Sequence, residues 1–187
     1  MLKELTELPS KKRNKYLSEF GLSAYDARVI SDEINMANFF EETVAKGVDA
    51  KLASNWVTSD IVGYLKANKL SFSELKLSPE NLAEMISLIS KNTISGKIAK
   101  EILPELIQKN ISPKKLVEEK GLAMISDSSS ISPIIDELIT EYPNEVQAFR
   151  NGKSKLLGFF VGQLMKRTKG KADPKLANKL LAEKLNS

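Results

Sequence analysis

Residues 155–174 read KLLGFFVGQLMKRTKGKADP, and their pattern decides how the C-terminal part of the chain folds. At 100° per residue, the apolar side chains gather on one side of a helix: Leu157, Phe160, Val161 and Leu164. The opposite side collects cations, glycines and one aromatic ring: Lys155, Gly158, Phe159, Gly162, Lys166 and Lys169. We therefore expect a helix over 155–168 that packs on its apolar side, a basic turn over 169–172, and a last helix that Asp173 caps and Pro174 begins.

Two glycines inside this helix need a reason, because each costs about 1 kcal/mol of helix stability relative to alanine. Close packing of another helix against Gly158 and Gly162 would be one reason. A bare helix surface that a bulky anion can approach would be the other. The lysines on the same side favour this second reading, because lysine is a poor neighbour for a packed helix. Gln163 lies at the edge of that side, where its amide could hydrogen-bond a ribose or a base.

The rest of the chain carries helix start and stop signals almost throughout. Ser or Asp N-caps, several followed by Pro at the first helical position, predict helix starts at these residues: Ser23, Ser31, Asp49, Ser78, Ser95, Ser112 and Ser132. Glycines predict helix ends at Gly21, Gly47 and Gly121. Residues 126–130 read SDSSS and indicate an exposed loop.

No segment alternates polar and apolar residues for the length of a strand, so we expect an all-α fold. A larger helical domain over 1–117 would be followed by a small three- or four-helix bundle, the tail domain, over 118–187. The core of the first domain is expected to hold Phe39, Phe40, Trp56 and Tyr64. No apolar run approaches the roughly 20 residues that a bilayer span needs, and the N-terminal residues lack a signal-peptide pattern, so we expect no membrane association.

Composition excludes most catalytic chemistry. The chain has neither cysteine nor histidine, which removes thiol nucleophiles, zinc–thiolate sites and the commonest general base. No glycine-rich phosphate loop is present. The acidic pairs Glu41-Glu42, Glu118-Glu119 and Asp136-Glu137 are adjacent in sequence, so on a helix their side chains diverge by about 100°. We therefore expect no catalytic residue and no metal site.

Charge is distributed unevenly along the chain. Residues 150–187 carry ten Lys and Arg against two acids, whereas the preceding residues are slightly acidic. This asymmetry indicates a polyanionic partner for the C-terminal segment, or else a lysine surface that only serves solubility.

The run over 158–181, GFFVGQLMKRTKGKADPKLANKLL, resembles the C-terminal signature of the GatB/YqeY family. Three upstream segments resemble the B subunits of tRNA-dependent amidotransferases within that family: GLSAYDA over 21–27, ASNWV over 53–57 and ISGKIAK over 94–100. The resemblance covers nearly the whole chain. Asp173 stands where Asn is more frequent in the family, and either residue can cap a helix.

The resemblance implies a cytoplasmic, tRNA-binding role without catalysis in this part of the protein. Its site residues would be Lys155, Gly158, Gly162, Gln163, Lys166, Lys169 and Lys171. In the full family member, ATP and Mg serve a kinase-like cradle domain that would precede Met1, and the A and C subunits are partners. No cofactor is expected in this part. Two alternatives remain open: a free-standing YqeY-like protein, and a helical adaptor whose glycine side docks a partner helix.

Overall fold

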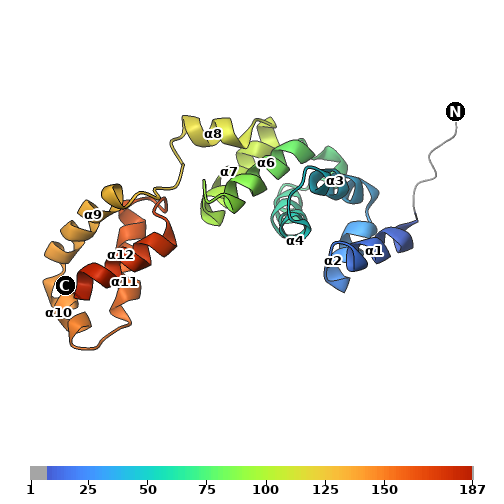
Figure 1. Cartoon of the computed structure of the whole chain (residues 1–187). Coiled ribbons are helices and arrows are strands. Elements are labelled where there is room, and N and C mark those ends of the chain that lie inside the picture. Colours follow the sequence, from blue (N-terminus) through green and yellow to red (C-terminus); the bar gives the residue numbers. More distant parts are fainter. Residues whose placement is uncertain (1–7, 187) are drawn as a thin grey trace. The chain divides into compact units, whose positions relative to one another are not determined.

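The computed structural model describes residues 8–186, and over this range the chain consists of α-helices, one π-helical segment and one 3-10 turn (Figure 1). The all-α prediction is confirmed, because the one β-type pairing among these residues is a single bridge between Ile125 and Ala172. None of the helices in this range is long and apolar enough to cross a membrane.

The chain divides into two compact units. Unit 1 comprises the chain up to Ser90 together with Lys100–Leu116, and unit 2 comprises Lys91–Ala99 together with the chain from Val117 onward. Within unit 2 the backbone N–H of Met124 donates to the Thr93 carbonyl (2.8 Å), which ties the short segment to the longer one. A division into domains at 1–117 and 118–187 stays a prediction, because compactness does not show that either part folds alone.

The helices of the first ninety residues are α1 (Pro9–Ser18), α2 (Ala24–Ser31), α3 (Ile34–Ala45), α4 (Ala50–Asn55), η1 (Trp56–Ile61), α5 (Val62–Ala67), η2 (Phe72–Glu74) and α6 (Pro79–Ser90). Two further helices, α7 (Gly96–Lys109) and α8 (Pro113–Glu119), contribute residues to both units. Unit 2 also holds α9 (Ser128–Glu141), α10 (Pro143–Arg150), α11 (Leu156–Arg167) and α12 (Pro174–Asn186).

Several expected caps are present. The Ser23 hydroxyl accepts from the backbone N–H of Asp26 (3.0 Å), and the Asp49 carboxylate accepts from that of Leu52 (2.8 Å). The predicted start at Ser31 is wrong, because Ser31 ends α2 and its buried hydroxyl donates to the Arg28 carbonyl (3.1 Å). Glu33 caps α3 instead, with its carboxylate accepting from two backbone N–H groups.

The serine-rich segment was also predicted wrongly. Residues 128–130 form the first turn of α9 rather than a loop, and Pro133 lies inside that helix rather than at its start. Asp127 is the cap: its carboxylate accepts from the backbone N–H groups and the hydroxyls of Ser129 and Ser130. These hydrogen bonds, above all those from the two hydroxyls, lower the pKa of Asp127 to about 2.

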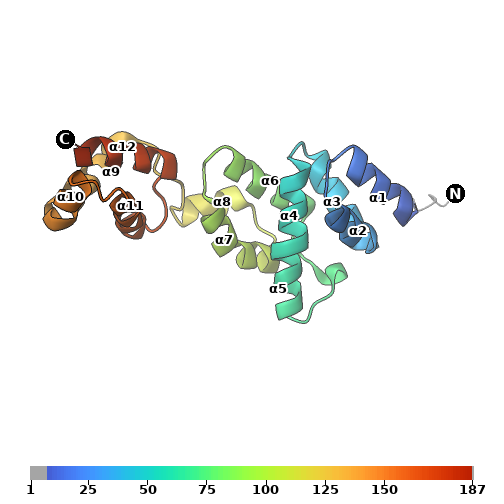
Figure 2. The same ribbon diagram turned by 90° about the horizontal axis from the view of Figure 1, so that it is seen from below.

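The predicted long helix after Asp49 is continuous but not uniform. In Figure 2, α4, η1 and α5 form one rod, and its central turn is the π-helical segment Trp56–Ile61. A π-helical turn places one extra residue in the turn and is found often at functional sites. Trp56 packs into unit 1 with the Lys100 ammonium 5.9 Å from its ring centre, while Lys100 also pairs with Asp60 (2.9 Å).

The core of unit 1 combines aliphatic side chains with aromatic rings, three of which form a cluster. The rings of Tyr16, Phe20 and Phe40 stack or meet edge to face at 5.3–5.9 Å. Phe39, Phe40 and Trp56 are buried as expected, whereas Tyr64 is half-buried and its hydroxyl accepts from Gln108 (3.1 Å). The prediction of a fully buried Tyr64 is therefore wrong, because its hydroxyl reaches a polar partner at the surface.

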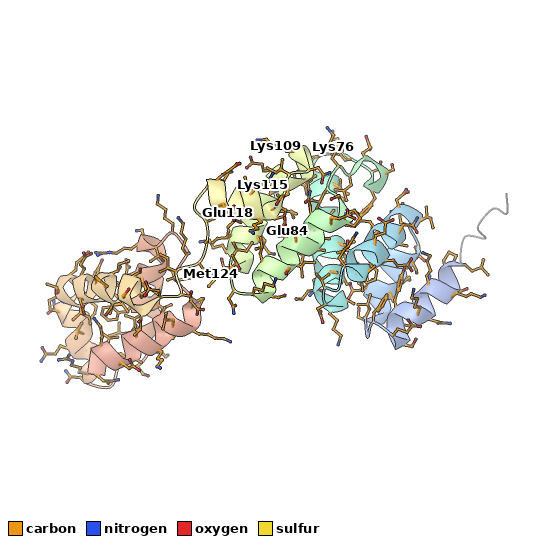
Figure 3. All side chains as sticks on the ribbon, turned by 45° about the horizontal axis from the view of Figure 1, so that its top comes forward. Lys76, Glu84, Lys109, Lys115, Glu118 and Met124 are labelled. Carbon is orange, nitrogen blue, oxygen red and sulfur yellow. The ribbon has the colours of Figure 1, made fainter. Side chains whose placement is uncertain are left out.

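Polar contacts fix the ends of α6 and α8. Glu84 extends from α6 beside α8 (Figure 3), and its carboxylate accepts from the Ser112 hydroxyl (2.7 Å) and the Lys114 backbone N–H (3.3 Å). Asn110 adopts a left-handed φ of 46° just after α7 and accepts from the Ser78 backbone N–H (2.8 Å). These bonds hold the helix termini that the Ser-Pro signals predicted.

Unit 2 has its own apolar core, contributed by α9 to α12 and the turn before α12. Its buried members are Ile131, Ile135, Leu138, Val146, Phe160, Leu164, Ala172, Ala177, Leu181 and Leu185. Figure 1 shows these four helices gathered into one bundle, from orange to red. The bundle positions α11 so that one side enters the core and the other meets solvent.

Candidate nucleic-acid interface

The outward side of α11 is open. A Cβ built on Gly158 or on Gly162 would have no heavy atom outside its own helical turn within 4 Å, and both residues are exposed. Phe160 and Leu164 point the opposite way and are fully buried, as the helical periodicity predicted. No described residue packs against the two glycines, so they do not serve helix packing within this chain.

Lysines border the two glycines. Lys155 precedes α11, Lys166 lies in its last turn and Lys169 follows in the turn, and all three are exposed. None of the three pairs with a carboxylate among residues 8–186. We call the surface formed by Lys155, Gly158, Gly162, Lys166 and Lys169 the glycine–lysine face. This face presents three lysines around two helix positions that carry no side chain.

Phe159 does not belong to this face, although the helical wheel placed it there. Its ring is half-buried and meets Tyr142 edge to face at 5.2 Å and Phe160 at 5.4 Å. Packing against Tyr142 removes apolar surface of the ring from water, so the ring turns toward the edge of the core.

The two other predicted site residues lie at the margin of the face. Gln163 and Lys171 are half-buried. The Lys171 carbonyl accepts from the Ile125 backbone N–H (2.7 Å), and the Asp173 backbone N–H donates to the Ile125 carbonyl (3.0 Å). This bridge fixes the basic turn to the segment before α9, which sequence periodicity could not reveal.

Arg167 does not add a free cation to the glycine–lysine face. Its guanidinium pairs with Glu137 (2.9 Å) and with Glu141, both on α9. The salt bridges turn this cation toward α9, and the lysines of the glycine–lysine face carry the free charge.

Lys97 is a cation near the basic turn that the local sequence pattern does not predict. Its Cδ lies 3.8 Å from the position that a Cβ on Gly170 would occupy, and the residue is exposed. Lys97 is remote from the basic turn in sequence, so no local pattern could place the two together. The Lys97 side chain thus adds a further exposed lysine of unit 2 beside the basic turn.

The turn after α11 is a Schellman motif with lysine in the position that glycine usually takes. The Gly170 N–H donates to the Met165 carbonyl (2.7 Å) and the Lys169 N–H donates to the Lys166 carbonyl (3.2 Å). Lys169 has a φ of 52°, in the left-handed region. The strained conformation projects a lysine where a glycine would be more stable.

Replacing Lys169 by glycine is therefore expected to raise the unfolding free energy by about 1 kcal/mol, because the left-handed conformation costs a side-chain-bearing residue roughly that much. Lys169→Ala is the matched control, since it removes the same charge but keeps the Cβ. Thermal melts of both variants check the prediction. Equal melting temperatures for the two variants would contradict it.

Among the residues that the structure describes, no group of three Asp, Glu, His or Cys side chains could hold a metal ion. The sequence has no glycine-rich phosphate loop either.

Comparison with known proteins gives a consistent picture. Residues 38–185 match the family model described as the GatB domain. The chain is 92% identical over 183 residues to the B subunit of an aspartyl/glutamyl-tRNA(Asn/Gln) amidotransferase from Prochlorococcus marinus (strain MIT 9312), which covers 98% of this chain and 37% of the relative. The protein of the same description from Parasynechococcus marenigrum (strain WH8102) is 59% identical over 182 residues, with 97% and 37% covered. The chain thus spans less than two fifths of the length of these curated relatives.

Proposed function

Because the chain belongs to the family of GatB domains, we propose that it is the tRNA-binding portion of the B subunit of an aspartyl/glutamyl-tRNA(Asn/Gln) amidotransferase. In this role it positions tRNA, and discriminates among tRNAs, for ATP-dependent transamidation carried out by a part of the protein outside this chain. The A and C subunits of the amidotransferase would be its protein partners, in the cytoplasm.

The observation that carries this proposal is the glycine–lysine face. Two glycines leave the helix surface bare, and three lysines that make no ion pair with any described residue border it. A phosphate backbone can then approach the helix closely while the ammonium groups neutralise its charge. Such contacts fix position and orientation but read no bases, which suits recognition of the outer body of a folded RNA by shape.

Relatives that cover almost the whole chain are described as amidotransferase B subunits, which favours this role over a free-standing YqeY-like protein. A helical adaptor is the alternative from a different class, since an open strip of small residues can also receive a helix. The two readings differ in their dependence on charge. Electrostatic binding of RNA weakens steeply as salt rises, and helix docking does not.

A competition experiment tests the proposal. Labelled whole tRNA is bound by the protein and displaced by unlabelled whole tRNA or by a hairpin of its acceptor stem. Recognition of the folded body predicts that the hairpin competes at least about tenfold less well, a difference of about 1.4 kcal/mol in binding free energy. Equal competition by both RNAs, or no binding of tRNA at low salt, would contradict the proposal and favour the helical adaptor.

A further inference from the structure

A second candidate site lies within unit 1, where two segments distant in sequence meet. A pocket of about 400 Å³ is lined by residues of 21–26 and of 51–55: Gly21, Leu22, Ser23, Asp26, Lys51, Ser54 and Asn55. These belong to or adjoin the segments GLSAYDA and ASNWV, which the glycine–lysine face does not use. The π-helical turn begins at the next residue, Trp56. We call this site the Ser54 pocket.

The hydroxyl of Ser54 is the feature that points to a ligand. Ser54 is 1% exposed, and its Oγ is the one buried side-chain N or O atom among the described residues without a hydrogen-bond partner. An unpaired buried hydroxyl lowers stability unless something satisfies it. Ser54 lines the pocket, and a rotation of its side chain toward the opening would let a polar atom of an occupant supply the missing partner.

A cation borders the same pocket. Gly21 adopts a left-handed φ of 62°, and the Lys51 side chain lies over it, with Nζ 3.7 Å from where a Cβ on Gly21 would be. Lys51 makes no ion pair with any described carboxylate. Its ammonium is therefore free to pair with an anionic group that enters the pocket.

The pocket also presents a carboxylate. Asp26 is half-buried, and its Oδ2 accepts from the Ser23 hydroxyl (2.6 Å), while Oδ1 is 3.5 Å from the Thr58 hydroxyl. A carboxylate has about four acceptor positions, so part of its capacity stays open. It would repel a bare phosphate and attract hydroxyl donors, such as those of a ribose.

These groups together select the ligand. Lys51 attracts an anionic group and the open acceptor positions of Asp26 attract hydroxyl donors, so an occupant that carries both suits the pocket. The volume lies within the range of small-molecule sites. We propose that the Ser54 pocket binds a ribonucleotide unit, with its phosphate at Lys51 and its ribose hydroxyls at Asp26 and Ser54. Either an RNA chain or a free nucleotide can supply this unit; the RNA source rests on the proposed function, and the free-nucleotide source does not.

Binding of AMP, followed by NMR at the amides of Gly21 and Asn55, tests the proposal without tRNA. We expect AMP to shift both resonances and the 2′-deoxy form to bind about 3- to 10-fold more weakly, the value of one hydrogen bond. Equal binding of the two nucleotides would overturn the proposal, and so would the absence of shifts with both AMP and a short single-stranded RNA. Shifts by the RNA alone would indicate the RNA source, and shifts by AMP the nucleotide source.

Ser54→Ala separates binding from folding. Loss of the unpaired hydroxyl is expected to raise the melting temperature by about 2 to 4 °C and to weaken AMP binding about 3- to 10-fold. Ser31→Ala is the matched control, because the Ser31 hydroxyl is buried but hydrogen-bonded. That variant should melt lower and bind AMP normally. A lower melting temperature with unchanged AMP affinity in Ser54→Ala would show a purely structural serine.

Lys51→Ala tests the phosphate position, with Lys66→Ala as an exposed lysine of the same unit outside the pocket. We expect only Lys51→Ala to weaken AMP binding, by at least about threefold, and to leave adenosine binding unchanged.

These variants leave the glycine–lysine face intact. The two proposals can therefore fail independently. The Ser54 pocket fails if Lys51→Ala leaves AMP binding unchanged, and the tRNA proposal fails if the tRNA affinity does not respond to substitutions of lysines in the glycine–lysine face. Shifts caused by a peptide in place of a nucleotide would assign the pocket to a protein partner and overturn the proposal.

Discussion

Gly162→Leu is expected to weaken tRNA binding at least about tenfold, a loss of about 1.4 kcal/mol, and to leave the protein at least as stable as before. A Cβ at this position meets nothing within 4 Å, so the larger side chain extends into solvent and does not overpack a core. Leucine is also a better helix former than glycine by close to 1 kcal/mol. The same side chain would stand between the helix and the phosphate backbone.

Gly63→Leu is the matched control. Gly63 also lies in a helix with open space around its Cβ position, but in α5 of unit 1. The control should keep full tRNA affinity and show a similar gain in stability. The comparison combines filter binding with thermal melts. A fall of many degrees in the melting temperature of Gly162→Leu would mean that another helix packs on the face, and unchanged affinity would remove the face from the RNA site.

The largest effect on stability is expected for Glu41→Ala. Glu41 accepts from the nearly buried ammonium of Lys12 (2.8 Å) and from the hydroxyl of Tyr16 (2.9 Å). Removing the carboxylate leaves the Lys12 charge buried without its ion-pair partner, which costs about 3 kcal/mol. The low end of the usual range applies because the Glu41 side chain is still 26% exposed.

A second substitution checks the cause. Lys12→Met in the Glu41→Ala background removes the uncompensated charge and should recover most of the lost stability in denaturant unfolding. Asp32→Ala is the control, because it breaks the more exposed Arg13–Asp32 pair (2.6 Å) and should cost less than about 1 kcal/mol. The Lys12–Glu41 pair would not stabilise unit 1 if Glu41→Ala also lowered the unfolding free energy by less than about 1 kcal/mol, or if the double variant recovered no stability.

Local signals predicted most of the fold. Ser23, Asp49 and Asp173 cap helices as expected, because a side chain three residues or fewer from the amide it satisfies leaves a readable pattern. The predictions for residue 31 and for residues 128–130 are wrong, because a different residue nearby in sequence caps the helix in each case. Ser31 has a partner on its own helix, and Asp127 rather than the Ser-Pro pair marks the start of α9.

The candidate site was only partly predictable. The helical period placed Gly158, Gly162 and the lysines on one side of α11, and it placed Phe160 and Leu164 on the other. It could not place Lys97 beside Gly170, nor the bridge between Ile125 and the basic turn, because both depend on chain segments that are distant in sequence. Nor could it turn Phe159 inward, since a ring at the edge of a helix face follows its neighbours rather than the period.

The salt dependence of tRNA binding tests the central claim most directly. Affinity is measured across a salt series for the unmodified protein and for the combined variant Lys155→Ala, Lys166→Ala and Lys169→Gly, where glycine preserves the left-handed turn. The pair Lys66→Ala and Lys69→Gly in unit 1 is the control, because Lys69 also has a left-handed φ, of 56°. If the glycine–lysine face holds the phosphate backbone, the combined variant should bind more weakly, and its plot of log affinity against log salt should be flatter by about 2 units, at roughly 0.7 per phosphate contact. An affinity and a slope equal to those of the unmodified protein would contradict the account.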